Sequence, residues 1–122
     1  MEKEKILIIE DNKLNRKLIT SLLSLKKFCV LEAEDAETGI EIARKSMPNL
    51  ILMDIQLPGM DGLAATRILK NDDHLKNIPI VAVTSYAMSG DEEKAITAGC
   101  VGYITKPIET RKFLKSIAEY IQ

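Results

Sequence analysis

The sequence predicts an α/β domain, in which one five-stranded parallel sheet carries helices on both faces. Two observations carry this prediction. Short apolar runs alternate five times with segments of helical periodicity, which is the pattern of a parallel sheet connected by helices. The runs are continuously apolar, as expected of strands buried on both faces. The chain has 122 residues, which suits a single domain spanning residues 1–122. Right-handed crossovers then favour the strand order 2-1-3-4-5.

The chain opens with a strand and a helix. Residues 5–10 (KILIIE) form the first apolar run, and Asn12 is a suitable N-cap for the helix that follows. Leucines then recur at spacings of 4, 4 and 3, which predicts one apolar helix face: Leu14, Leu18, Leu22 and Leu25.

The next strand, helix and strand occupy residues 29–53. Residues 29–31 predict a short second strand, and residues 50–53 predict a third buried strand that stops at Asp54. Between them, apolar residues again follow helical spacing: Ala36, Ile40, Ala43 and Met47. Pro48 ends this second helix.

The second half repeats the alternation. After a loop marked by Pro58-Gly59 and Asp61-Gly62, residues 63–70 predict a third helix. The remaining elements are a strand at 80–83, a small-residue helix at 91–98 closed by Gly99, a strand at 101–104, and a last helix marked by Phe113, Ile117 and Tyr120.

Composition excludes several classes of function. With 17 basic and 18 acidic residues the net charge is −1, which disfavours nucleic acid as a partner. No apolar run approaches the roughly 18 residues of a membrane helix, and the N-terminus lacks the core of a signal peptide. We therefore expect a cytoplasmic protein with no membrane partner. A lone histidine, His74, excludes sites built from several histidines, and we expect it in a surface loop.

The two cysteines, Cys29 and Cys100, fall at opposite edges of the predicted sheet. Four strand spacings separate those edges by about 19 Å. A disulfide requires Cα atoms within about 7 Å. We expect both cysteines to be small buried apolar residues and not a redox pair.

Three acidic residues lie at the edge of the sheet that is formed by the carboxyl ends of its strands. Glu10 and Asp11 end the first strand, and Asp54 ends the third, where a doubly wound sheet binds its ligands. Taken singly, each acid could cap a helix or solvate a loop. Together they repel one another, and a hard cation such as Mg²⁺ relieves this repulsion. Zinc is disfavoured because the available ligands are all oxygen.

Two further strand ends add a hydroxyl and an ammonium group. The fourth strand finishes at Thr84, and the fifth leads into Lys106. A metal, a hydroxyl and a lysine around one pocket suit a phosphoryl group, which Asp54 can accept as a nucleophile. Taken alone, Lys106 reads as a solvated surface lysine. We hypothesise that the Lys106-Pro107 bond is cis, which would turn the lysine inward.

These residues match a known family. From KILIIEDN through LILMDIQLPGMDG, VAVTS and YITKPI, the whole chain resembles the CheY-like receiver domain of bacterial response regulators. The resemblance implies a flavodoxin-like (βα)5 fold. It also implies these roles: Asp54 as phosphoacceptor, Glu10 and Asp11 as the acidic pair, the Gln56 carbonyl as a Mg²⁺ ligand, Lys106 as the phosphate-binding lysine, Thr84 as the switch hydroxyl and Tyr103 as the switch aromatic.

The resemblance also implies partners. A sensor histidine kinase or a histidine phosphotransfer protein would supply the phosphoryl group, since His74 does not fit a donor. Output to a downstream protein would use the face built by the fourth helix, fifth strand and last helix, in a monomer or a phosphorylation-dependent dimer. Such a domain catalyses only its own phosphotransfer and dephosphorylation. Residues 88–108 are similar to the stand-alone DivK type, although an excised domain of a larger regulator stays open.

Two rival functions share parts of this pattern. A flavodoxin-like electron carrier needs a Ser/Thr/Gly-rich phosphate loop after the first strand, where this chain has Asp11-Asn12. A phosphohydrolase of the haloacid-dehalogenase type usually carries a second aspartate two residues after the nucleophile, where this chain has Gln56. The departures from the receiver pattern are few: Ser85 replaces the usual alanine, and Tyr86 occupies a variable position that tunes dephosphorylation in relatives.

Overall fold

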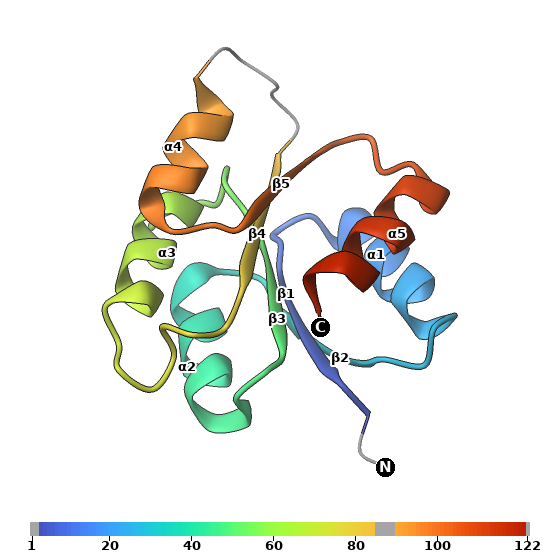
Figure 1. Cartoon of the computed structure of the whole chain (residues 1–122), viewed down its shortest axis with the longest axis horizontal. Helices are drawn as coiled ribbons and strands as arrows, with labels where there is room; N and C mark the ends of the chain where they lie inside the picture. The colour runs from blue at the N-terminus through green and yellow to red at the C-terminus, as the bar shows by residue number, and fades with distance from the viewer. Residues whose placement is uncertain (1–2, 85–89, 122) are drawn as a thin grey trace.

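The computed structural model describes residues 3–84 and 90–121 and contains one parallel sheet (Figure 1). Its five strands lie in the order β2-β1-β3-β4-β5, which confirms the predicted fold class. The strands are β1 (Lys5–Ile9), β2 (Cys29–Ala33), β3 (Leu50–Asp54), β4 (Ile80–Thr84) and β5 (Gly102–Thr105).

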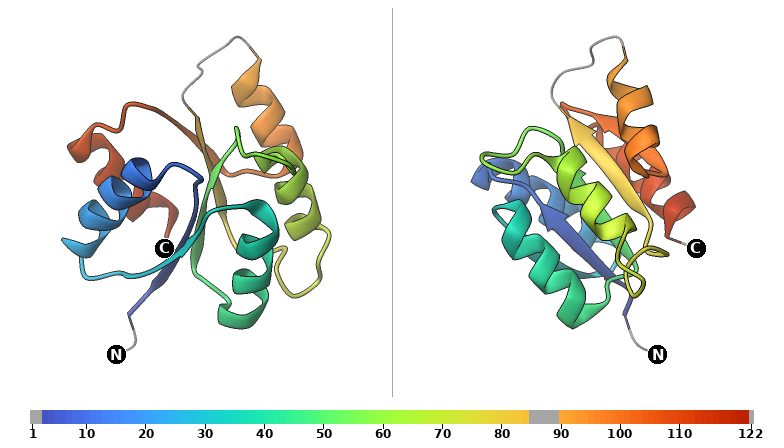
Figure 2. Two further views of the ribbon diagram at one scale, coloured as in Figure 1. Left: turned by 180° about the vertical axis from the view of Figure 1, so that it is seen from behind. Right: turned by 90° about the vertical axis from the view of Figure 1, so that its left-hand side faces the viewer.

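Helices cover both faces of the sheet. Helices α1 and α5 lie on one face and α2, α3 and α4 on the other, as Figures 1 and 2 show. The bounds are α1 (Lys13–Ser24), α2 (Ala36–Ser46), α3 (Gly62–Lys70), α4 (Asp91–Ala98) and α5 (Thr110–Tyr120). Among the described residues, none of these helices has the length and apolar character needed to cross a membrane.

The two-sided cover explains why the strands are continuously apolar. Successive strand residues point to opposite faces, so β1 supplies both cores. Leu7 and Ile9 belong to the core under α2–α4, whereas Ile6 and Ile8 belong to the core under α1 and α5. Strands β1 and β3 pair in register from Ile6↔Leu50 to Ile9↔Met53, which brings their carboxyl ends together.

The predicted apolar face of α1 is wrong for three of its four leucines. Leu14, Leu18 and Leu25 are 76%, 44% and 70% exposed, and only Leu22 of this set is buried. The face that packs on the sheet holds Arg16, Ile19, Leu22 and Leu23. Two apolar stripes overlap on this helix, and its periodicity alone does not show which one meets the sheet. Asn12 is the predicted N-cap, with its side chain accepting from the Asn15 amide at 2.9 Å.

The cysteines differ from each other. Both are free, and Cys100 is buried as predicted. The predicted burial of Cys29 is wrong, because it begins the edge strand β2, which has a neighbouring strand on only one side. Its thiol is exposed.

Candidate functional site

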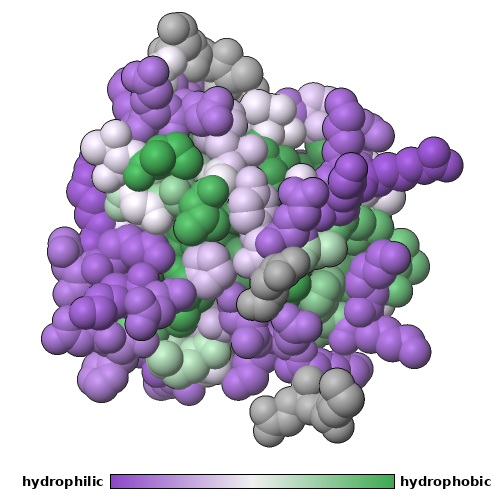
Figure 3. Space-filling view, viewed as in Figure 1, coloured by the Kyte–Doolittle hydropathy of each residue, from purple (hydrophilic) through white to green (hydrophobic). Residues whose placement is uncertain are grey.

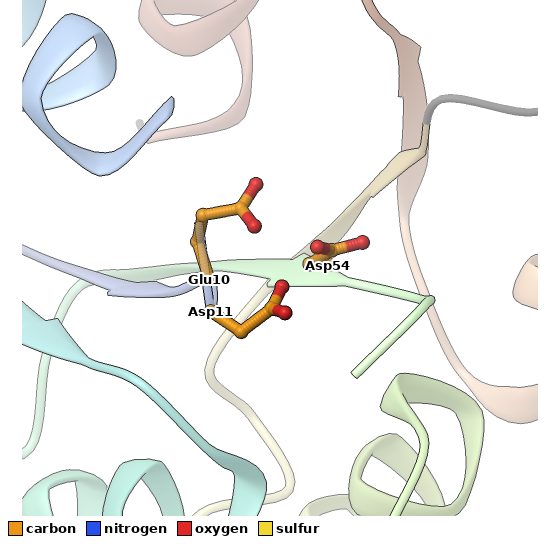
Figure 4. A group of neighbouring side chains, drawn as sticks. All are labelled: Glu10, Asp11 and Asp54. Carbon is orange, nitrogen blue, oxygen red and sulfur yellow. The ribbon is translucent and has the colours of Figure 1, made fainter. Parts of the chain in front are cut away.

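The three acidic residues meet at the carboxyl ends of β1 and β3. Glu10 and Asp11 follow β1 directly, and Asp54 is the last residue of β3. One carboxylate oxygen from each lies within 4.8 Å of the others, and Figure 4 shows the three side chains around a common space. The convergence results from the pairing of β1 with β3, which places these strand ends side by side.

Two of these carboxylates are buried. Glu10 is 2% and Asp54 is 4% exposed, whereas Asp11 is exposed. Burial raises the pKa of Glu10, and a hydrogen bond with Asp54 raises this pKa further. Hydrogen bonds from Lys106 and from the Asn12 amide act in the opposite direction on the pKa. The site therefore concentrates negative charge where water screens it poorly.

Lys106 supplies the positive charge facing this cluster. Its Nζ contacts Glu10 Oε1 and lies 3.5 Å from Asp54 Oδ2. The Lys106–Pro107 peptide bond is cis, as hypothesised. The Lys106 amide donates to the Thr84 carbonyl at 2.7 Å, which ties the end of β5 to the end of β4. A solvated surface position for Lys106 is excluded, because only 11% of its side chain is exposed.

Gln56 connects the phosphoacceptor candidate to the candidate switch residue. Its backbone amide donates to Asp54 Oδ1 at 3.0 Å. Its side-chain Nε2 donates to Thr84 Oγ1 at 2.6 Å, and Thr84 is fully buried. The receiver resemblance implied a role only for the carbonyl of Gln56, and no local pattern signals the side-chain bond, which joins residues 28 positions apart.

Arg16 is a site residue that sequence reasoning missed. Its Nη1 donates to the carbonyls of Glu10 at 2.8 Å and Asp11 at 3.1 Å. Its remaining nitrogens lie near Glu32 and Glu34, at 3.5 Å and 3.3 Å. The available signal was a charged residue one helical turn before Ile19, on the face that packs on the sheet. Arg16 thereby holds the backbone from which the acidic pair projects.

Gly62 is a second missed residue, at the start of α3. A Cβ atom at this position would overlap the carbonyl oxygen of Asp54 and lie 2.8 Å from the Cα of Ile55. The Gly62 amide also donates to the Ile55 carbonyl at 3.0 Å. Only glycine therefore lets α3 begin against the backbone that carries Asp54.

Tyr103 lies on β5. It is partly buried and packs against the core under α2–α4. Burial raises its pKa, and the nearby charges of Asp91 and Glu92 in the first turn of α4 raise it further. Its side chain thus lies on the face of β5 that is covered by α4. Ser85 and Tyr86 lie outside the described residues.

Comparison with known proteins supports this geometry with independent matches. The sequence model of the response regulator receiver domain family matches residues 6–118. The polar-differentiation response regulator DivK of Brucella anthropi is 43% identical over 116 residues, covering 95% of this chain and 94% of that protein. DivK of Brucella ovis is 42% identical over the same length. The electron-carrier alternative is not favoured by these matches.

Solved structures resemble the chain over nearly its whole length. The receiver domain of the sensor histidine kinase PA1611 from Pseudomonas aeruginosa, solved with a magnesium ion in its active-site cleft, is 30% identical with a TM-score of 0.90 and 98% coverage of both chains. The receiver domain of the Saccharomyces cerevisiae response regulator Ssk1, solved with the histidine phosphotransfer protein Ypd1, is 29% identical with a TM-score of 0.89. It covers 98% of this chain and 89% of that one.

Proposed function

The chain belongs to the response-regulator receiver family, and on that premise we propose that Asp54 is the residue that accepts the phosphoryl group. One observation carries this proposal: the buried Asp54 carboxylate lies among Glu10, Asp11 and the Lys106 ammonium group. We propose further that the receiver domain extends over residues 1–122, slightly beyond the matched residues 6–118, and acts in the cytoplasm.

The acidic cluster suits Mg²⁺. Oxygen ligands at close range are what this ion prefers, and it retains several waters that phosphate oxygens can replace. Asp11, Asp54 and the Gln56 carbonyl would hold the ion directly, and Glu10 would act through water. When bound, the ion neutralises charge on the phosphoryl oxygens.

The phosphoryl group would come from a phosphohistidine on a sensor histidine kinase or a histidine phosphotransfer protein. An Asp54 carboxylate oxygen attacks phosphorus, the N–P bond breaks, and its electron pair stays on the imidazole nitrogen. Lys106 compensates charge on the transferred oxygens. Leu14 and Leu18 are exposed on α1, which begins two residues after Asp11, so we expect the donor to cover them. Receiver domains are not conventional enzymes, and this self-catalysed transfer is the only reaction that we assign.

Output would follow from a movement of Thr84. Its hydroxyl would turn toward the new phosphoryl oxygen, and Tyr103 would turn into the space that it leaves. The changed face would consist of α4, β5 and α5. Figure 3 shows apolar surface over α4, and Ile96 on α4 and Val101 before β5 are about half exposed, at 48% and 50%. This face would contact a downstream protein, from a monomer or a phosphorylation-dependent dimer.

The test uses acetyl phosphate, Mg²⁺ and intact-mass measurement. We expect one phosphoryl group on the native chain, none on Asp54→Asn, and none on the native chain when EDTA removes the metal. Asp61→Asn is the matched control, because Asp61 caps α3 at the same edge of the sheet and asparagine also caps helices. Equal modification of Asp54→Asn and the native chain would refute the assignment.

A further inference from the structure

One side chain links the phosphoacceptor loop to the proposed switch. Gln56 lies in the loop after β3, and its Nε2 donates to Thr84 Oγ1 across 2.6 Å. The Thr84 side chain is fully buried at the end of β4, whereas Gln56 is exposed. A surface residue therefore supplies a hydrogen bond to a hydroxyl that bulk water does not reach.

The bond affects the balance between two positions of Thr84. A buried hydroxyl that loses a partner loses free energy unless another partner replaces it. In the unphosphorylated chain, Gln56 supplies such a partner and holds Oγ1 near the loop. A phosphoryl group on Asp54 would offer acceptor oxygens to the same hydroxyl. The bond to Gln56 opposes any movement of Oγ1 toward those oxygens that lengthens it.

We propose that the Gln56 side chain is a positioning residue that restrains Thr84 in the unphosphorylated state and opposes the switch. The inference rests on the proposed function of Asp54 and Thr84, and it assigns to Gln56 a role separate from that of its carbonyl. Its backbone amide, which donates to Asp54 Oδ1, ties the same residue to the site that triggers release. The cost of breaking this bond thereby offsets part of the favourable free energy of phosphoryl binding.

The test measures the affinity for beryllofluoride with Mg²⁺, a mimic of the phosphoryl group, by calorimetric titration. Gln56→Met keeps the length of the side chain and removes its amide. We expect this variant to bind the mimic about two- to tenfold more tightly, the range that one net hydrogen bond represents. In a Thr84→Ala background the same change should have no effect, because the restrained hydroxyl is absent. Asn77→Leu, which removes an exposed amide from the loop before β4, should bind as the native chain does.

The outcomes distinguish the restraint of Thr84 by Gln56 from the proposed function of Asp54. Unchanged or weaker binding by Gln56→Met would overturn the restraint, and weaker binding would show that the bond persists in the phosphorylated state. An equal gain in the Thr84→Ala background would also overturn it, since the effect would then not pass through Thr84. Failure of the native chain to bind beryllofluoride, together with no phosphoryl addition at Asp54, would refute the proposed function itself and this inference with it. Thermal unfolding of each variant checks that the fold is retained.

Discussion

Two lysines lie at opposite ends of the strands, one at the carboxyl edge of the sheet and one at its amino edge. They show that these two edges use polar groups differently. Lys106, at the carboxyl edge, contacts the carboxylates of Glu10 and Asp54. Lys70, the last residue of α3, donates to the backbone carbonyls of Lys76 at 3.0 Å and Ile78 at 2.7 Å, just before β4 begins. One lysine faces charges and the other faces neutral dipoles.

The difference separates binding from stability. At the amino edge, the partners of Lys70 are the backbone carbonyls of Lys76 and Ile78, so the contact holds the loop between α3 and β4 against the end of α3. At the carboxyl edge, one ammonium group contacts two of the three clustered carboxylates, and negative charge is left over for a cation. The fold alone therefore leaves the acidic cluster with net negative charge.

The largest expected effect comes from replacing these two lysines. Lys106→Met should slow phosphorylation by acetyl phosphate about 100-fold, because a charge that stabilises the transferring oxygens is lost. Lys70→Met should leave this rate unchanged and lower the free energy of unfolding by about 1–3 kcal/mol, because its charged hydrogen bonds are lost. Rates are measured by intact mass and stability by urea denaturation.

Equal behaviour of the two variants would contradict the assignment of binding to the carboxyl edge and of stability to the amino edge. A slow Lys70→Met chain that is fully folded would mean that the amino edge also governs the chemistry. A Lys106→Met chain that reacts at the native rate would remove Lys106 from the proposed site.

The next effect tests the carboxyl edge through its backbone. Gly62→Ala should lower the free energy of unfolding by about 3 kcal/mol, because its Cβ would overlap the Asp54 carbonyl, and neither backbone can move cheaply. Displacement of Asp54 should also slow phosphorylation at least about tenfold. Urea denaturation and intact-mass kinetics measure the two effects.

Gly59→Ala is the matched control in the same loop. Gly59 has a φ of +75° but open space around its Cβ position. We expect this variant to cost about 1 kcal/mol of strain and to react at the native rate. Slow phosphorylation of Gly59→Ala would show that the whole loop, and not the Gly62 contact, positions Asp54.

The fold and the acidic cluster were predictable because both depend on local patterns. Continuous apolar runs mark strands buried on both faces, and whatever follows such runs gathers at one edge of the sheet. Glu10, Asp11 and Asp54 were found on this basis. The receiver resemblance added the role of the Gln56 carbonyl and that of Tyr103, for which no local pattern exists.

What escaped prediction depends on how distant side chains meet. The helical spacing of α1 shows an apolar stripe, but the sheet selects Ile19 and Leu23 and leaves Leu14 exposed. The bonds from Arg16 to the carbonyls of Glu10 and Asp11, and from Gln56 to Thr84, join separate elements through particular rotamers. Periodicity contains no information on these contacts.

The smallest expected effect concerns acid stability and again contrasts the two edges. Burial raises the pKa of Glu10 at the carboxyl edge. At the amino edge, the His74 amide donates to Asp72 at 2.8 Å and lowers the pKa of Asp72, and Arg44 lowers this pKa further. An acid whose pKa is lower in the folded chain stabilises the fold above its unfolded pKa, here 3.8, and this contribution disappears as the pH falls through the folded pKa.

Asp72→Asn isolates this charge, because asparagine can still accept from the His74 amide. We expect the variant to be slightly less stable than the native chain at pH 7, and the two urea denaturation curves to converge as the pH falls below 3.8. Raised salt should reduce the difference at pH 7, since the Arg44–Asp72 pair is at the surface. A difference that persists unchanged at pH 2 would show that Asp72 contributes through its shape and not its charge, and the contrast with Glu10 would then rest on burial alone.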